Sequence, residues 1–261
     1  KYYIERGYVP EGIKAKGQHK DGASMTLEYA YQDWCIAQMA KTMGKHKDFE
    51  HFMNRSKNYQ NLWNPNTGLM HPRNIDGSWI ENFTPVAEKF NTIGFCESNS
   101  AIYTNYVPHD INGLANLFGS KENYTSFLLN SFKKANDNRF VAPHREHAKS
   151  WVDYENQPSC QMAHLFNFTD TPWLTQKWVR KIKDVTFGDT TPYGGYNGDE
   201  DQGQIGALGA LMAIGVFQMD GGVSENSQYE ITSPIFDTIE IALNPDYYSN
   251  NKFVITTNNN T

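Results

Sequence analysis

The chain has little cysteine, no long apolar run and no excess of basic charge. Its three cysteines, Cys35, Cys96 and Cys160, are far apart and form no C-x-x-C pair, so we expect buried free thiols. No segment approaches about eighteen consecutive apolar residues, so no membrane span is predicted. A formal net charge of -6 provides no basic stripe for phosphates, which argues against a nucleic-acid partner.

The common catalytic motifs are also missing. There is no G-x-S-x-G, H-E-x-x-H or G-x-x-x-x-G-K-[ST] sequence. His144 and His147 are three residues apart, but nothing nearby completes a zinc site, so we interpret them as a surface pair. The first residues lack the apolar core of a signal peptide, although a mature chain would lack one as well.

The composition is that of a compact globular protein with many aromatic residues. Of the 261 residues, 39% are hydrophobic and 20% are charged, which excludes a disordered or collagen-like chain. Aromatic residues make up 14%, beside abundant amides and carboxylates. This combination suits either a large aromatic core or a sugar-binding cleft, where rings pack on sugar C–H surfaces and polar groups bind hydroxyls.

Hydrophobic periodicity predicts helices separated by long polar loops, followed by strands. The longest predicted helix covers 26–43, with Gly44 placed to end it. A few short strands cannot bury a face alone, so the tail should join a sheet completed outside this chain. Further helices are expected at 49–62, 101–106, 109–117, 124–135, 159–166, 173–185 and 204–217, and strands at 229–231, 238–243 and 252–257.

An acidic segment, GDEDQGQ at 198–204, lies at the start of a predicted helix. Its carboxylates, Asp199, Glu200 and Asp201, could activate water as a general base or bind a cation. Alternatively, Asp201 and Gln204 form a capping box, and the other carboxylates only complement the helix dipole. The local sequence leaves both interpretations open.

Two further segments carry groups suited to catalysis. Glu97 is flanked by Phe95, Cys96 and small residues, and partial desolvation there would raise its pKa and suit it to proton donation. Tyr154-Glu155-Asn156-Gln157-Pro158 offers several oxygen donors of the kind that calcium or sugar hydroxyls require. Taken alone, a Glu in a loop is usually solvated, and a segment such as 154–158 is more often a polar turn before a helix.

These segments together resemble glycoside hydrolase family 92, the calcium-dependent exo-acting α-mannosidases. The stretch SMTLEYAYQDWCIAQ at 24–38 is similar to the family's SxTLEYAYDDWCIAQ. The other matching motifs follow in the family's order: GLM at 68–70, PR at 72–73, ESN at 97–99, VPHD at 107–110, NQPS at 156–159, PWLTQ at 172–176 and the acidic segment at 198–204.

The resemblance implies a mainly α fold. In the family, an (α/α)6 toroid forms the catalytic domain, a β-sandwich precedes it, and strands near the C-terminus return to that sandwich. Residues 1–219 would then be part of the toroid, and 220–261 the strand segment. Family members are much longer, so the chain resembles an internal piece cut at both ends, and the N-terminal β-sandwich of the same protein is an expected partner.

The resemblance also implies roles for particular residues. Glu97 would be the general acid of an inverting reaction, and Asp199 and Asp201 would position and deprotonate the attacking water. The cofactor would be Ca²⁺, which in the family contacts the mannose 2- and 3-hydroxyls. Asn156 and Gln157, with Asp201, match the motifs beside that ion and would form its shell.

The substrate would be a mannose-containing glycan. Asp33, Trp34 and Arg73 match motifs that line the terminal mannose subsite, while Tyr154 and Glu155 fall in the motif that meets the acceptor sugar. Two departures stand out: Gln157 replaces a common Glu, which removes a charge beside the metal, and Tyr154 replaces the His of many α-1,2-specific members.

The expected activity is therefore release of terminal non-reducing mannose, with α-1,2 linkage favoured, from N-glycans or mannans. A non-catalytic mannoside-binding fragment and an inverting (α/α)6 glycosidase for another sugar remain the alternatives. The family's members are mostly exported, which implies a secreted, periplasmic or cell-surface protein.

Overall fold

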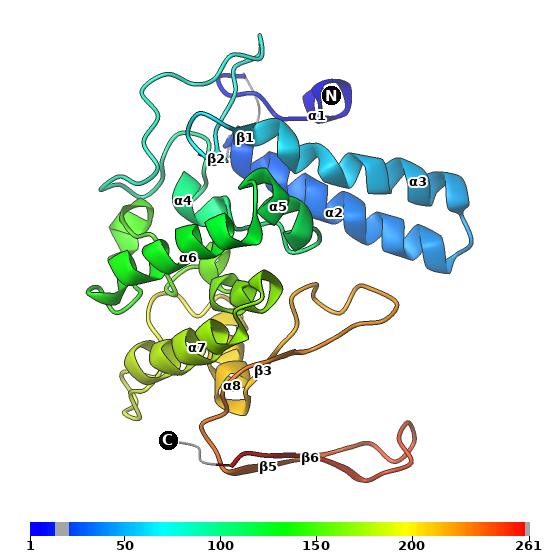
Figure 1. Ribbon diagram of the computed structural model, residues 1–261, viewed down its shortest axis with the longest axis vertical. Coiled ribbons are helices and arrows are strands. Elements are labelled where there is room, and N and C mark those ends of the chain that lie inside the picture. The colour runs from blue at the N-terminus through cyan, green and yellow to red at the C-terminus, as the bar shows by residue number, and fades with distance from the viewer. Residues whose placement is uncertain (14–20, 259–261) are drawn as a thin grey trace.

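The computed structural model describes residues 1–13 and 21–258 and is built mainly of helices (Figure 1). α2 and α3 form an antiparallel pair at the N-terminal end, α4 to α8 follow below them, and the β5–β6 hairpin lies at the C-terminal end (Figure 1). The helices are α1 (Tyr2–Arg6), α2 (Gly22–Thr42), α3 (His46–Arg55), α4 (Ser100–Tyr103), α5 (Ile111–Leu117), α6 (Lys121–Asn136), α7 (Pro172–Thr186) and α8 (Gln204–Ile214).

Short 3-10 helices and strands complete the element order. The strands form three separate antiparallel pairs, β1 with β2, β3 with β4, and β5 with β6. Their bounds are η1 (Ser56–Leu62), β1 (Trp63–Asn64), β2 (Leu69–Met70), η2 (His144–Lys149), η3 (Gln157–Ser159), η4 (Met162–Thr169), β3 (Val216–Phe217), β4 (Glu230–Ile231), β5 (Thr238–Ala242) and β6 (Lys252–Thr256).

The predicted first helix is confirmed as α2. Its buried face includes Leu27, Ala30 and Ala37, whose spacing keeps them on one side of the helix. Gly44, with φ of +68°, follows the helix end in a left-handed conformation that glycine adopts without strain. This buried face packs against the core, and residues on the adjoining face of α2 line the cavity described below.

Three predicted helices differ from the structure. The helix expected at 49–62 changes to 3-10 geometry at η1, where the Tyr3 hydroxyl and the His109 Nε2 bond to the carbonyls of Arg55 and Ser56. The helix expected at 159–166 is replaced by η3 and η4. The helix expected at 204–217 ends at Gly215, whose φ is +83°, and Val216–Phe217 pairs with β4 instead.

The core between α6 and α7 is aromatic. Phe132 lies at its centre, with ring centroids 5.3 to 6.1 Å from those of Phe140, Phe166 and Trp178. Such contacts make large buried rings the main source of packing energy here. The abundant aromatic residues therefore serve the core, as one of the two interpretations of the composition predicted, and also line the cavity.

The predicted strand tail is present as the β5–β6 hairpin. Its side chains are mostly exposed, including Phe253 and Val254. A two-stranded hairpin is marginal alone, so the expectation that it joins a larger sheet stays a prediction, as does the boundary at 219–220.

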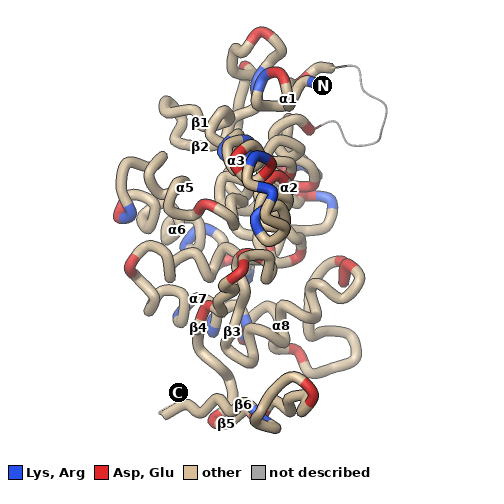
Figure 2. Tube along the Cα trace, turned by 90° about the vertical axis from the view of Figure 1, so that its right-hand side faces the viewer, with Lys and Arg blue, Asp and Glu red and all other residues tan. Residues whose placement is uncertain are grey.

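The charges of the described residues are mixed. Lys and Arg are scattered among Asp and Glu along the trace (Figure 2). Across the part of the chain that the structure describes, no helix combines the length and apolar character needed to cross a membrane.

Candidate active site

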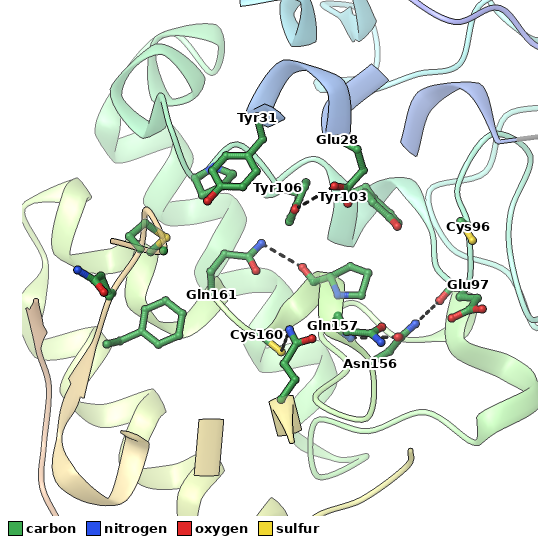
Figure 3. A pocket seen from close by; sticks show the side chains of 17 residues that line it. Glu28, Tyr31, Cys96, Glu97, Tyr103, Tyr106, Asn156, Gln157, Cys160 and Gln161 are labelled. Carbon is green, nitrogen blue, oxygen red and sulfur yellow. Dashed lines mark hydrogen bonds between the residues drawn. The ribbon is translucent and has the colours of Figure 1, made fainter. Parts of the chain in front are cut away.

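A cavity of about 510 Å³ lies between the N-terminal helices and the later half of the chain. Glu28 and Tyr31 project into it from α2, while Glu97, Asn156 and Gln157 lie across from them (Figure 3). Its size is typical of small-molecule sites, and its lining of aromatic rings, carboxylates and amides suits a hydroxylated ligand. Segments far apart in sequence thus converge on one site.

Glu97 belongs to a loop fixed from several sides. The Cys96 amide donates to the Ser24 Oγ at 2.9 Å, and the Asn156 Nδ2 donates to the Glu97 carbonyl at 2.6 Å. Glu97 itself has a φ of +50°, a left-handed conformation that is strained for a residue with a side chain. Strain of this kind persists only where the surroundings enforce it and is concentrated at functional sites.

Asn156 and Gln157 connect the Glu97 loop to the acidic segment. Beyond its bond to the Glu97 carbonyl, Asn156 accepts a hydrogen bond from the Gln157 amide at 3.0 Å. The Gln157 Nε2 then donates to the Asp201 Oδ2 at 2.6 Å. Two carboxylate-bearing loops 104 residues apart in sequence are therefore held by one hydrogen-bonded chain.

Asp201 is the second strained carboxylate, with a φ of +56°. Its pKa is raised, first by burial and then by the negative charges of Asp199 and Glu200, against the lowering effect of the Gln157 hydrogen bond. Asp199 is exposed, with its carboxylate 3.7 Å from the His144 Nδ1, and it does not line the cavity. The acidic segment thus presents Asp201 to Gln157 and Asp199 to solvent.

The capping-box prediction for Asp201 and Gln204 is wrong. The Glu200 carboxylate accepts the Gly203 amide with one oxygen and the Gly206 amide, at 3.2 Å, with the other. Left-handed backbone at Asp201 and Gln202 brings Glu200 back over the helix start. Because Glu200 caps α8, the Asp201 carboxylate is left to accept the Gln157 side chain, and it reaches the cavity through Gln157 without lining the cavity itself.

The His144–His147 pair is also not a surface pair. Only His144 is exposed, whereas His147 is buried with its Nδ1 2.9 Å from the Asp153 Oδ2. Asp153 also accepts the amides of Ala142 and Glu155. Among the described residues, His147, Asp153 and Glu155 form a group whose possible ligand atoms lie within 4.8 Å of one another.

His147 should make stability depend on pH. Burial alone would lower its pKa, but the hydrogen bond and charge of Asp153 overcome this and raise it. The stabilisation is therefore complete below the unfolded pKa of about 6.5 and is lost as pH rises through the higher folded pKa. We expect His147→Gln to lower the free energy of unfolding by about 2 kcal/mol at pH 5.5 and by less at pH 8.5.

Urea unfolding of the two proteins at both pH values measures this difference. His46→Gln, which replaces an exposed imidazole on α3, is the matched control and should shift stability by less than about 0.5 kcal/mol. If His147→Gln lowered the free energy of unfolding equally at both pH values, the His147–Asp153 contact would stabilise the fold by packing alone, without a change in proton binding.

Comparison with known proteins agrees with this geometry. The model of the family described as "Glycosyl hydrolase family 92 catalytic domain" matches residues 1–261. The chain belongs to glycosyl hydrolase family 92. Among curated proteins, an uncharacterized secreted glycosidase of Arthroderma benhamiae is 27% identical over 260 residues, covering 90% of this chain and 30% of that protein.

Two solved family 92 enzymes of Bacteroides thetaiotaomicron share the fold of this chain. One is an α-mannosidase, 34% identical with a TM-score of 0.78 over 98% of this chain and 31% of that one. The other, described as an inverting mannosidase, is 29% identical with a TM-score of 0.79 over 100% of this chain and 34% of that one. The family 92 chain thus spans about a third of the length of these relatives.

The residues expected at the acceptor sugar separate in the family 92 structure. Tyr154 is fully buried, and its hydroxyl accepts the Ala163 amide at 3.1 Å. Glu155 is half-buried and packs against Gly198, where an added Cβ would lie 2.0 Å from the Glu155 Cγ. Glycine at 198 therefore allows the acidic segment to approach Glu155 closely.

In the described part of the family 92 chain, the residues expected at the terminal mannose do not line the cavity that Glu97 borders. Asp33 is buried, in an ion pair of 2.9 Å with Arg55 and a hydrogen bond from the Tyr3 hydroxyl. Trp34 borders a smaller neighbouring cavity of about 200 Å³. The Arg73 guanidinium lies over the Trp79 ring, 4.1 Å from its centroid.

Two features of the cavity were not foreseen. Glu28 lines it, although its position in the α2 periodicity gave no sign of this. Cys96 and Cys160 line it as well, and burial raises their pKa values to about 11 and about 12. Neither thiol forms a disulfide, as predicted, and both are therefore protonated near neutral pH, which leaves the carboxylates as the candidate bases of this site.

Proposed function

We propose that this chain is the catalytic part of an exo-acting α-mannosidase that releases terminal non-reducing mannose with inversion. The observation that carries the proposal is the hydrogen-bonded chain from Glu97 through Asn156 and Gln157 to Asp201, beside a cavity of sugar size. The two similar solved enzymes, which are mannosidases of the same family, support it.

In this proposal, Glu97 and Asp201 divide the proton transfers. Glu97 protonates the glycosidic oxygen as the bond between C1 and that oxygen breaks, and Asp201 takes a proton from the water whose oxygen bonds to C1 from the opposite face. The negative charge of Asp199, which faces solvent in the structure, contributes to the raised pKa of Asp201. Water enters on the face opposite the leaving group, so the configuration at C1 inverts.

The residues beside Asp201 suit Ca²⁺. Asn156, Gln157 and Asp201 provide amide and carboxylate oxygens, the hard donors that this ion prefers, and Gln157 already contacts Asp201. Bound there, calcium would contact sugar hydroxyls and favour a distorted ring. The His147 group includes an imidazole nitrogen, which suits calcium less.

The setting of the activity is part of the proposal. An α-1,2-linked mannose of an N-glycan or mannan would be the substrate, and the protein would be secreted, periplasmic or exposed at the cell surface, which the secreted curated relative supports. The exposed β5–β6 hairpin would complete a β-sandwich with an N-terminal domain of the same protein.

Mannose release from α-1,2-linked mannobiose by the full-length protein tests this function. We expect release that is lost on chelation and restored by Ca²⁺ but not by buffer alone. The neutral amide of Gln157 would hold the ion less tightly than a carboxylate, so a chelator should remove it and added Ca²⁺ should replace it. Folded protein that binds mannosides without releasing mannose would contradict the proposal and support the binding alternative. Preference for another sugar would support a different inverting glycosidase.

A further inference from the structure

The cavity holds one carboxylate that the proposed reaction does not use. Glu28 is half-buried on α2, and its Oε2 accepts one hydrogen bond, from the Tyr106 hydroxyl at 3.3 Å (Figure 3). No Lys, Arg or His among residues 1–13 and 21–258 forms an ion pair with it. Burial raises its pKa, against the lowering effect of the Tyr106 hydrogen bond.

A carboxylate with so few partners has hydrogen-bonding capacity left for a ligand. Two carboxylate oxygens accept about four hydrogen bonds, and a single long one is present in the described structure. The surroundings also suit a sugar, because Tyr31, Tyr103 and Tyr106 line the same part of the cavity. Tyrosine rings pack on sugar C–H surfaces while their hydroxyls remain available for polar contacts.

The hydroxyls that could reach Glu28 follow from its place in the cavity together with the role proposed for Glu97. Glu97 must contact the glycosidic oxygen at C1 if it acts as the acid, which fixes the reacting end of the sugar beside the Glu97 loop. Glu28 projects from α2 across the cavity from Asn156 and Gln157 (Figure 3). In a pyranose ring, C4 lies opposite C1, and C6 is bonded to C5, the ring atom next to C4.

We propose that Glu28 is a specificity-determining residue that accepts hydrogen bonds from the C4 and C6 hydroxyls of the terminal sugar. This inference rests on the proposed function, since it takes the orientation of the sugar from the role of Glu97. Tyr106 holds the Glu28 carboxylate through its hydroxyl, and the neighbouring rings cover the sugar face. Sugars that lack a hydroxyl at either position would then be poorer substrates.

The test compares α-mannoside, 4-deoxy and 6-deoxy substrates with the full-length wild type and the Glu28→Gln and Glu28→Ala variants. Wild type should lose about 10- to 100-fold in kcat/KM on at least one deoxy substrate, because Glu28 then lacks a partner. Both variants should lose a similar factor on the parent substrate, mainly through KM, and should no longer distinguish that deoxy substrate from the parent. Glu28→Gln preserves the side-chain volume and keeps the test valid if Glu28→Ala unfolds.

Glu50→Gln, at an exposed position of α3, is the matched control and should leave all three kcat/KM values unchanged. An active wild type whose variants retain the full discrimination against both deoxy substrates would overturn the role of Glu28 alone. A folded wild type with no activity on the parent substrate would overturn the proposed function and this inference together.

Discussion

Glu97→Gln should lower kcat/KM for α-linked mannobiose by about 10³- to 10⁴-fold, because the amide cannot protonate the departing sugar oxygen. A 2,4-dinitrophenyl α-mannoside needs no such protonation, so the same variant should lose less than about tenfold on it. Steady-state kinetics of the full-length protein on the two substrates measure this contrast. It separates loss of an acid from loss of structure, since misfolding would impair both reactions equally.

The control for this experiment is Glu81→Gln, which changes an exposed carboxylate to an amide without touching the cavity. It should match the wild type on both substrates. Equal losses on the two substrates in Glu97→Gln protein with a wild-type melting temperature would contradict the assignment of Glu97 as the acid.

Asp201→Asn should lower activity by about 10³-fold on both substrates, since water must be deprotonated whatever the leaving group. The amide can still bond to Gln157 after a flip, so the fold should be preserved. Parallel assays with mannobiose and the dinitrophenyl mannoside, together with thermal unfolding, measure both effects. Recovery of Asp201→Asn on the activated substrate would instead place this residue on the leaving-group side.

Asp246→Asn is a suitable comparison, because Asp246 is an exposed carboxylate in the turn before β6. Its activity on either substrate should equal that of the wild type. The opposite responses of Glu97→Gln and Asp201→Asn to leaving-group quality would together define the acid and the base.

Periodicity predicted the elements that depend on local sequence. The apolar stripe of α2 and the alternating strands of β5 and β6 are found where the pattern placed them. It failed where distant groups decide the backbone, as at η1, where Tyr3 and His109 take the carbonyls that an α-helix would have used. Such long-range hydrogen bonds leave no mark on local hydrophobicity.

The site was predictable in the same uneven way. The ordered motifs brought Glu97, Asn156, Gln157 and Asp201 into one hypothesis, and in the structure hydrogen bonds connect them. The burial of His147 was missed because its partner, Asp153, is held by a fold-dependent pair of amides. Glu28 was missed because a helix pattern shows which residues face the core and not which border a cavity within it.

The left-handed backbone at Glu97 and Asp201 sets stability against activity. A side chain in this conformation costs roughly 1 to 2 kcal/mol that glycine would not, so each carboxylate makes the fold less stable than the alternative that removes it. Under the proposed function, glycine at either position would remove this cost together with a carboxylate that the reaction needs, so stabilising changes are better sought elsewhere.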